Sequence, residues 1–124
     1  MQFILLLYSE ESGWAKLTQT EQEQAMVDYS TYIDTLMSVG VLKFVDRLQP
    51  SAMAKTVHVA PDKEEVIFGK KEVKDCPFVD AKEQLGGYFI IEVPSLAAAI
   101  EWAALCPGAR HGVVEVRPSC CKPE

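Results

Sequence analysis

The sequence predicts an α+β fold in which strands and helices alternate around one antiparallel sheet. Two observations carry this prediction: four main apolar segments have the length of strands, and two longer segments start at helix-capping residues. The chain has 124 residues, of which 48% are hydrophobic, so it is long enough to form one globular core. We therefore expect a single domain over residues 1–118, followed by a mobile tail at residues 119–124.

The first strand and the first helix are marked at their ends. Phe3 to Tyr8 is an unbroken apolar run, which indicates a buried strand, and Glu10 to Leu17 is predicted to be a loop. Thr18 and Glu21 fit a capping box at the start of a helix, and Gly40 favours its end. Steps of three and four residues predict an inward helix face made of Met26, Tyr29, Ile33, Leu36 and Met37.

The middle of the chain predicts a strand followed by a hairpin. Val41 to Leu48 is β-compatible and is stopped by Pro50. Lys55 to Val59 alternates polar and apolar residues, which is typical of a half-exposed strand. Glu65 to Phe68 follows a turn and is predicted to be the short return strand of an inserted hairpin.

The last third of the chain repeats the pattern of strand, helix and strand. Tyr88 to Val93 predicts a main strand, and Gly112 to Arg117 predicts the last one. Between them, Ser95 caps a second helix that ends before Gly108. The residues of this helix that we expect to face inward are Leu96, Ile100, Ala103 and Cys106.

This order of elements predicts the ferredoxin-like split βαβ pattern, an antiparallel sheet with both helices on one face. Phe3–Leu7 and Tyr88–Ile91 are apolar on both sides of the strand, so both faces of the sheet need a cover. Two helices cover only one face. We therefore predict a homodimer, in which the sheets of two copies pack face to face and form a dimeric α/β barrel.

Charge and cysteine usage narrow the class of partner. The formal net charge of −6 argues against nucleic acid and against an anionic membrane surface, both of which favour a basic face. The apolar opening segment lacks a basic leader and is too short to span a bilayer, so we expect a cytoplasmic protein. Its four cysteines, at positions 76, 106, 120 and 121, are then expected to be reduced thiols. No cofactor signature or metal-ligand spacing is present, and none is expected.

The stretch KDCPFVDAKEQLGGY, residues 74–88, is the first candidate site. In the functional interpretation it forms a pocket rim, with Asp75 as a carboxylate base and Lys82 as an anion-binding cation. In the structural interpretation Pro77 stiffens a corner that Phe78 anchors in the core. The third interpretation is partner binding. The candidate ligand-binding residues here are Pro77, Phe78, Lys82, Glu83, Gly86 and Gly87, and the two glycines allow close backbone approach or a left-handed residue.

Two further places carry candidate residues. His111 lies just before the last strand, where an imidazole could move a proton, although a solvated loop residue is the plainer interpretation. Tyr8 and Trp14 could line a cleft for a small aromatic or polar ligand, and the alternative for Trp14 is a hydrophobic plug. Glu115 and Arg117 share one side of the last strand, which favours a structural ion pair.

Several motifs along the chain resemble the YCII-related family, and specifically its branch named for the tetrapeptide Asp-Gly-Pro-Phe, the DGPF type. They are Leu5–Tyr8, Leu48-Gln49-Pro50, Asp75-Cys76-Pro77-Phe78, Lys82–Tyr88, Glu101-Trp102-Ala103 and Val114–Pro118. Within the tetrapeptide, Cys76 replaces the usual glycine, and Asp80 stands where glutamate is common. The resemblance implies a dimeric α+β barrel of ferredoxin-like topology.

The resemblance implies little about chemistry. Some YCII-type relatives are lyase-like enzymes that act on chlorinated aromatic compounds with a His–Asp pair near the first helix. This chain has Asp28 and Asp34 in that helix but no histidine. Three hypotheses follow: a homodimer that binds a small molecule, a lyase or isomerase that uses Asp75 and His111, and an interaction module in a regulatory pathway.

Overall fold

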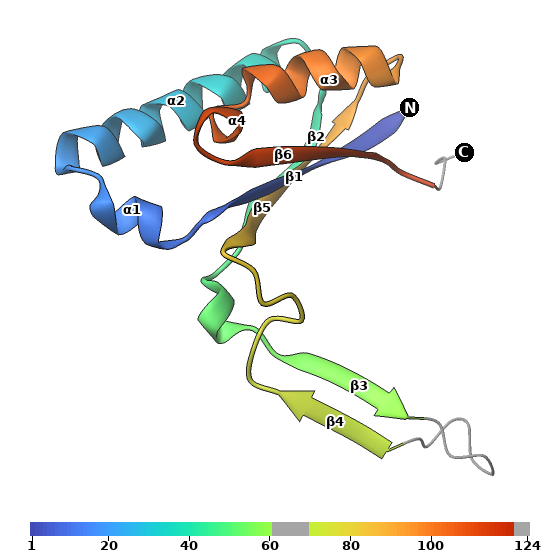
Figure 1. Ribbon diagram of the computed structural model, residues 1–124. Helices are drawn as coiled ribbons and strands as arrows, with labels where there is room; N and C mark the ends of the chain where they lie inside the picture. The colour runs from blue at the N-terminus through green and yellow to red at the C-terminus, as the bar shows by residue number, and fades with distance from the viewer. Residues whose placement is uncertain (61–69, 121–124) are drawn as a thin grey trace. The chain divides into compact units, whose positions relative to one another are not determined.

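The computed structural model of the chain describes residues 1–60 and 70–120. These residues form two compact units (Figure 1). The larger unit comprises Met1–Leu48 and Lys82–Glu124, and the smaller comprises Gln49–Ala81. The prediction of a single domain over residues 1–118 stays a prediction.

The larger unit is an α+β structure, as predicted. Its elements are β1 (Gln2–Glu10), α1 (Ser12–Lys16), α2 (Gln19–Ser38), β2 (Leu42–Arg47), β5 (Glu83–Glu92), α3 (Leu96–Leu105), α4 (Gly108–His111) and β6 (Val113–Pro118). The four strands form one sheet in the order β2-β5-β1-β6, and every neighbouring pair is antiparallel. This topology is compatible with the ferredoxin-like pattern.

The start and end of α2 confirm the predictions made from local sequence. The Thr18 hydroxyl accepts the Glu21 N–H at 3.1 Å, and the Glu21 carboxylate accepts the Thr18 N–H at 3.0 Å. This reciprocal capping box satisfies two amides that the helix leaves free. Past the other end, Gly40 has a φ of +74°, which a residue with a side chain rarely adopts.

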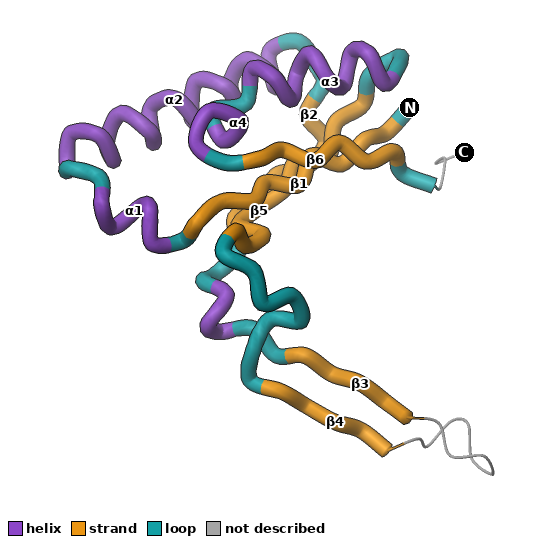
Figure 2. Tube along the Cα trace, in the orientation of Figure 1, coloured by secondary structure: helices purple, strands orange, loops and turns teal. Residues whose placement is uncertain are grey.

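The core lies between one face of the sheet and the helices α2 and α3 (Figure 2). The ring of Tyr32 meets Phe89 edge-on at 5.4 Å, and its hydroxyl donates to the Trp102 carbonyl at 2.6 Å, so this residue joins α2 to both the sheet and α3. The buried residues are Phe3, Leu5, Tyr32, Leu36, Phe89, Ile91, Val93, Ala99, Ala103 and Cys106.

The predicted inward faces of the two long helices were wrong in part. On α2, Met26 and Met37 are each 62% exposed, because the buried stripe is rotated toward α3 and centres on Tyr32 and Leu36. On α3, Leu96 and Ile100 are about half exposed, whereas Ala99, Ala103 and Cys106 are buried. Alanine lets this helix approach the sheet and α2 closely, whereas Ile100 lies at the border of this contact, where it faces β6 across a groove.

Three local predictions also differ from the structure. The predicted loop over Glu10 to Leu17 contains the short helix α1. The residue His111 ends the short helix α4 and does not lie in an open loop. The strand expected from Tyr88 begins at Glu83, because the segment before it continues the antiparallel pairing with β1 beyond an irregularity at Leu7 and Tyr8.

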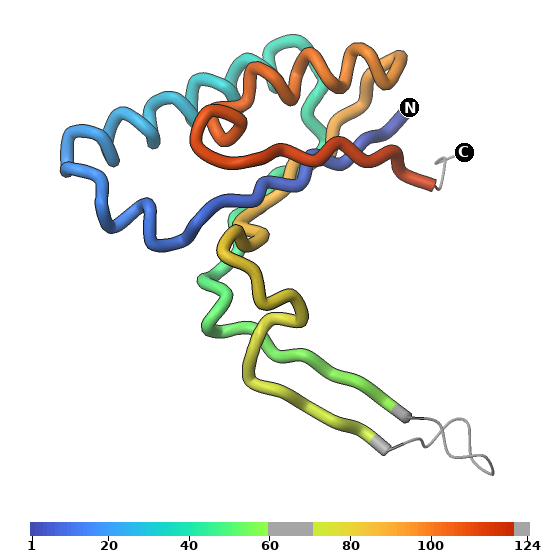
Figure 3. Tube along the Cα trace, in the orientation of Figure 1, coloured from blue at the N-terminus to red at the C-terminus, as the bar shows by residue number. Residues whose placement is uncertain are grey.

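The smaller unit is the predicted inserted hairpin. A single 3-10 turn, η1 (Ser51–Met53), precedes the antiparallel pair β3 (Thr56–Ala60) and β4 (Lys70–Lys74). Figure 3 follows the chain from β2 into this hairpin and back into β5. The expected return strand at Glu65 to Phe68 lies outside the described residues, and β4 is the return strand that the structure describes.

Candidate functional site

The face of the sheet opposite the helices is apolar and uncovered by any described part of the larger unit. We call this the open face, and its apolar residues are Ile4 and Leu6 of β1, Phe44 of β2, and Tyr88 and Ile90 of β5. The rings of Phe44 and Tyr88 lie 6.1 Å apart, and Phe44 is 51% exposed. The two-sided apolar character that the strands predict is therefore present in the structure.

A polar edge borders the open face at β6. Arg117 hydrogen-bonds to Glu115, which confirms the predicted ion pair. This bond is the main cause that holds the pKa of the Glu115 carboxyl below its ordinary value, and Tyr8 adds a smaller contribution. Tyr8 therefore lies on the open face and not beside Trp14, with which it was predicted to share a cleft.

The helix-covered face carries a different group of residues at the end of the sheet. We call it the Tyr29 site, and it consists of Trp14, Tyr29, Arg47, Gly108 and Arg110. Arg47 ends β2 and pairs with Gly87, two residues before the buried Phe89, so its side chain is on the covered face. The Arg47 guanidinium carbon lies 5.7 Å from the centre of the Trp14 ring, within the range of a cation–π contact.

Gly87 shapes the floor of this site. A Cβ on Gly87 would lie 2.9 Å from the Asp46 carbonyl oxygen, so β2 and β5 approach as closely as glycine permits. The predicted close backbone approach is thus confirmed at Gly87, and neither glycine of the pair has a positive φ. Gly87 is buried, and in the sheet it lies between Arg47 of β2 and Leu7 of β1.

Tyr29 brings a hydroxyl to the site from α2. A Cβ on Gly108 would lie 2.7 Å from Tyr29 Oη and 3.3 Å from Leu7 Cδ2, so the phenol fits because residue 108 is glycine. The hydroxyl forms no hydrogen bond with any described residue. Burial raises the pKa of Tyr29 to about 12 and Cys106 adds to the rise, whereas Arg47 and Arg110 oppose it. The phenol is therefore neutral at pH 7 and can donate.

The two arginines differ in their partners. Arg110 lies 3.6 Å from Asp28 of α2 and is neutralised by it. Arg47 forms no ion pair within the part of the chain that the structure describes. Two guanidinium cations and one carboxylate leave one net positive charge, which belongs to Arg47.

Cys106 lies behind the Tyr29 site and is fully buried. Burial raises the pKa of its thiol, and the N–H groups of Gly108 and Ala109 offset part of that effect. A buried neutral thiol is a packing group rather than a nucleophile.

The loop that the sequence singled out is exposed in the smaller unit. Asp75 pairs with Lys55 at 2.8 Å, and its side chain is 79% exposed. The Thr56 hydroxyl donates to the Cys76 carbonyl at 2.6 Å, and the φ of Cys76 is not positive. Phe78 is 87% exposed, so the prediction that it anchors the loop in the core was wrong. Pro77 beside it is partly buried.

The remaining predicted residues lie in the larger unit. Lys82 pairs with Glu10 at 3.8 Å rather than with an acid of its own loop, and Glu83 faces Glu10 across β5 and β1. Gly86 accepts the Leu48 N–H through its carbonyl. His111 is exposed at the end of α4. Asp75 belongs to the smaller unit and His111 to the larger one.

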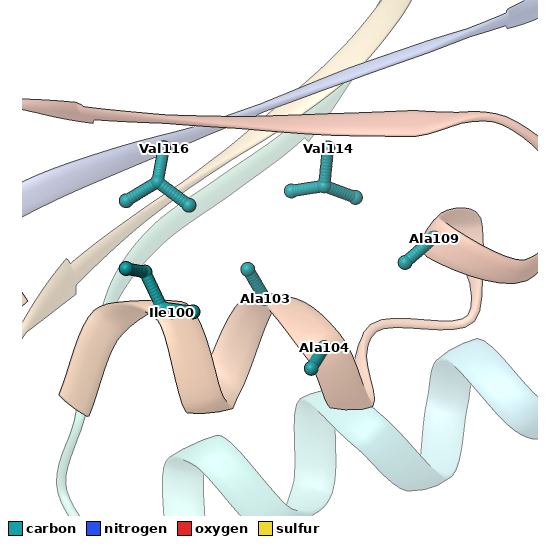
Figure 4. A pocket seen from close by; sticks show the side chains of 6 residues that line it. All are labelled: Ile100, Ala103, Ala104, Ala109, Val114 and Val116. Atoms are coloured by element: carbon teal, nitrogen blue, oxygen red, sulfur yellow. The ribbon is translucent and has the colours of Figure 1, made fainter. Parts of the chain in front are cut away.

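A groove between α3 and β6 is purely apolar (Figure 4). Its volume is about 330 Å³, and it is lined by Ile100, Ala103, Ala104, Ala109, Val114 and Val116. No polar side chain lines it, so it offers packing and no chemistry. Among the described residues, no group of three His, Cys, Asp or Glu side chains is arranged to hold a metal ion.

Sequence reasoning missed most of the Tyr29 site. One signal was available: Arg47 is a cation at the end of a strand whose alternate position, Val45, packs on the core. Tyr29 was identified only as a packing residue of α2, and Trp14 was proposed as a cleft wall with a different neighbour. The structure brings these three residues together from β2, α2 and α1.

These features define a class: an α+β domain whose antiparallel sheet carries helices on one face and a bare apolar surface on the other. Residues 1–119 match the YCII-related domain, and the chain belongs to this family. It is 32% identical over 120 residues to an uncharacterised protein, R00369, of Rhizobium meliloti (strain 1021), covering 95% of this chain and 91% of that one. In the described part of the chain, no helix combines the length and apolar character needed to cross a membrane.

Proposed function

We propose that this chain is a homodimer that binds a small molecule in the Tyr29 site. The observation that carries the ligand proposal is the partly buried Tyr29 hydroxyl, which has no hydrogen bond to a described residue and lies near two guanidinium groups. No fully buried side-chain oxygen among the described residues lacks a hydrogen-bond partner, so solvent reaches the Tyr29 hydroxyl and a ligand could accept from it in place of water. Leu7 and the Trp14 ring supply the apolar walls that ligand sites favour.

The open face supports the homodimer. Five apolar side chains from three adjacent strands form one continuous surface, and a contiguous apolar patch of this kind is rare on a monomer. A second copy is the partner that presents the same surface and closes the pair by two-fold symmetry. The dimer would be the α/β barrel that the sequence predicts.

The dimer proposal is tested by placing a charge on the open face. Phe44→Glu should convert the protein to a monomer at micromolar concentration, measured by light scattering after size-exclusion chromatography. Leu96→Glu is the matched control, because Leu96 is similarly exposed, at 47% against 51%, but lies on α3. A wild-type monomer, or a Phe44→Glu dimer of unchanged affinity, contradicts the proposal.

The ligand proposal is tested by two glycine substitutions. Gly108→Ala should weaken the binding of small aromatic fragments seen by ligand-observed NMR, because the new Cβ displaces Tyr29 Oη. Gly13→Ala is the control, since a Cβ there meets nothing within 4 Å. Fragments that bind equally to both variants and to the wild type would place the ligand elsewhere.

The branch and the compartment are proposals as well. The tetrapeptide Asp75-Cys76-Pro77-Phe78 supports the DGPF-type branch of the family. The thiols of Cys76 and Cys106 form no disulfide, which supports a reducing, cytoplasmic location. Fractionation of cells that produce the protein tests this location.

A second candidate function is an interaction module in a regulatory pathway. Leu96 and Ile100 of α3 are about half exposed and lie one turn apart, so they form an apolar surface apart from the open face. A photo-crosslinker at Leu96 should capture one defined protein in cells, while a crosslinker at the polar position Glu101, about 140° around the helix from Leu96, should not. Labelling of only the protein's own partner subunit, or of nothing, contradicts this function. No observation favours a lyase or isomerase that uses Asp75 and His111, because Asp75 is an exposed partner of Lys55.

A further inference from the structure

We infer that the ligand of the Tyr29 site is a small monocarboxylate with an apolar body. This inference rests on the proposed function and names the chemical class of ligand. It follows from three properties of the site: its net charge, the kind of donors that it presents, and the character of its walls.

The net charge favours a single negative charge on the ligand. Arg110 is already paired with Asp28, which also accepts a hydrogen bond from Gln24 at 2.9 Å. Arg47 is the unpaired cation, so a monoanion makes the site neutral. A phosphate dianion would leave one negative charge without compensation, and a cation would meet Arg47 in repulsion.

The donors match the shape of a carboxylate. A guanidinium presents a planar fork of N–H groups, and it can stack on an aromatic ring while its edge binds a carboxylate through two parallel hydrogen bonds. Arg47 has such a ring contact with Trp14 at 5.7 Å. The Tyr29 hydroxyl adds a neutral donor, since it has no acceptor among the described residues.

The walls favour an apolar body for the ligand. Leu7 Cδ2 lies beside the position that a Gly108 side chain would occupy, so an apolar side chain stands next to the Tyr29 hydroxyl. The indole of Trp14 is 39% exposed and so remains accessible beside Arg47. Benzoate combines one carboxylate with a planar apolar ring and is therefore the probe of choice.

The test compares three probes on the full-length protein by isothermal titration calorimetry. Benzoate carries one negative charge, benzamide is its neutral counterpart, and phenyl phosphate is a dianion above pH 7. We expect benzoate to bind at least tenfold more tightly than either of the others. A hydrogen bond to a charged group contributes enough for a change on the order of ten- to a hundredfold.

Variants in β2 test whether Arg47 is the residue that binds the carboxylate. Arg47→Gln should weaken benzoate binding at least tenfold and leave benzamide binding within about twofold. Arg47→Lys keeps the charge but loses the fork, so its affinity for benzoate should fall between wild type and Arg47→Gln. Lys43→Gln is the control, because it removes a positive charge from the same strand four residues away, about 13 Å along β2 and beyond the Debye length.

The outcomes separate the inference from the proposed function. If benzamide or phenyl phosphate binds as tightly as benzoate, the carboxylate assignment is overturned while the Tyr29 site stands as a ligand site. If Lys43→Gln weakens benzoate as much as Arg47→Gln does, the effect is long-range attraction, and the assignment of Arg47 is overturned. If wild type binds none of the three probes at millimolar concentration, the inference and the proposed ligand site both fail.

Discussion

Two tyrosines on the same face of α2 allow a controlled comparison between a hydroxyl that stabilises the fold and a hydroxyl that is proposed to bind a ligand. Tyr32 is 6% exposed, and its hydroxyl donates to the Trp102 carbonyl at 2.6 Å. Tyr29, one turn earlier, has no such partner among the described residues. We predict that Tyr32→Phe destabilises the fold and that Tyr29→Phe does not.

The expected loss of stability in Tyr32→Phe follows from the surroundings of the Trp102 carbonyl, which accepts the hydrogen bond of Tyr32. Trp102 lies in the last turn of α3, and the Cys106 N–H bonds to the Ala103 carbonyl instead of the Trp102 carbonyl. The Tyr32 hydroxyl is therefore the group that satisfies the Trp102 carbonyl, and the phenylalanine variant would leave this partly buried acceptor unsatisfied. The free energy of unfolding should fall by about 1–2 kcal/mol. For Tyr29→Phe the change should stay within about 0.5 kcal/mol.

Urea unfolding followed by circular dichroism measures both changes. Protein concentration is held constant, because unfolding of a dimer depends on it. With an m-value of about 1–3 kcal/mol/M, the midpoint of Tyr32→Phe should fall by about 0.3–2 M. Equal losses for both variants would show that Tyr29 has a structural hydrogen bond after all. A larger loss for Tyr29→Phe would refute the distinction on which the Tyr29 site depends.

Three other predictions follow from the same structure. Raising the pH from 9 to 12 should lower the urea midpoint, because Cys106, Tyr29 and Tyr32 have raised pKa values in the fold and therefore ionise first in the unfolded chain. Each proton that only the unfolded chain has lost lowers the free energy of unfolding by about 1.4 kcal/mol per pH unit. A midpoint that is constant over this range contradicts the prediction. Replacing residues 49–81 by a short Gly-Ser linker should keep the larger unit folded, seen as a cooperative thermal transition, since every core residue lies outside that segment. Phe44→Glu should leave benzoate affinity unchanged within about twofold in calorimetry, because Phe44 and Arg47 lie on opposite faces of β2; a large loss would mean that dimerisation builds the site.

Local signals in the sequence predicted most of the larger unit. The hydroxyl and carboxylate of Thr18 and Glu21, and the missing Cβ of Gly40, act within a few residues, so a single sequence is enough to place both ends of α2. The unbroken apolar segments likewise predicted that both faces of the sheet are apolar. These predictions needed no knowledge of which elements are neighbours.

Predictions failed where the answer depends on a neighbouring element. Tyr32 is buried because α3 supplies its acceptor, and Met26 is exposed because α3 draws the buried stripe away from it. Helix α3 is apolar at every position except Glu101, so periodicity could not show that its alanines face the sheet. Phe78 is hydrophobic and was assigned to the core, yet it is exposed in the smaller unit.

The arrangement of the two faces explains why the candidate site escaped the sequence. Alternation along a strand puts Phe44 on the open face and Arg47 on the covered one, so a single segment contributes to both the proposed dimer surface and the proposed ligand site. The sequence shows that alternation, but the cation becomes a site only when α1 brings Trp14 over it and α2 brings Tyr29 beside it. Gly108 leaves room for the Tyr29 hydroxyl and Gly87 lets β2 and β5 approach closely, so the candidate site depends on side chains that are missing as well as on those present.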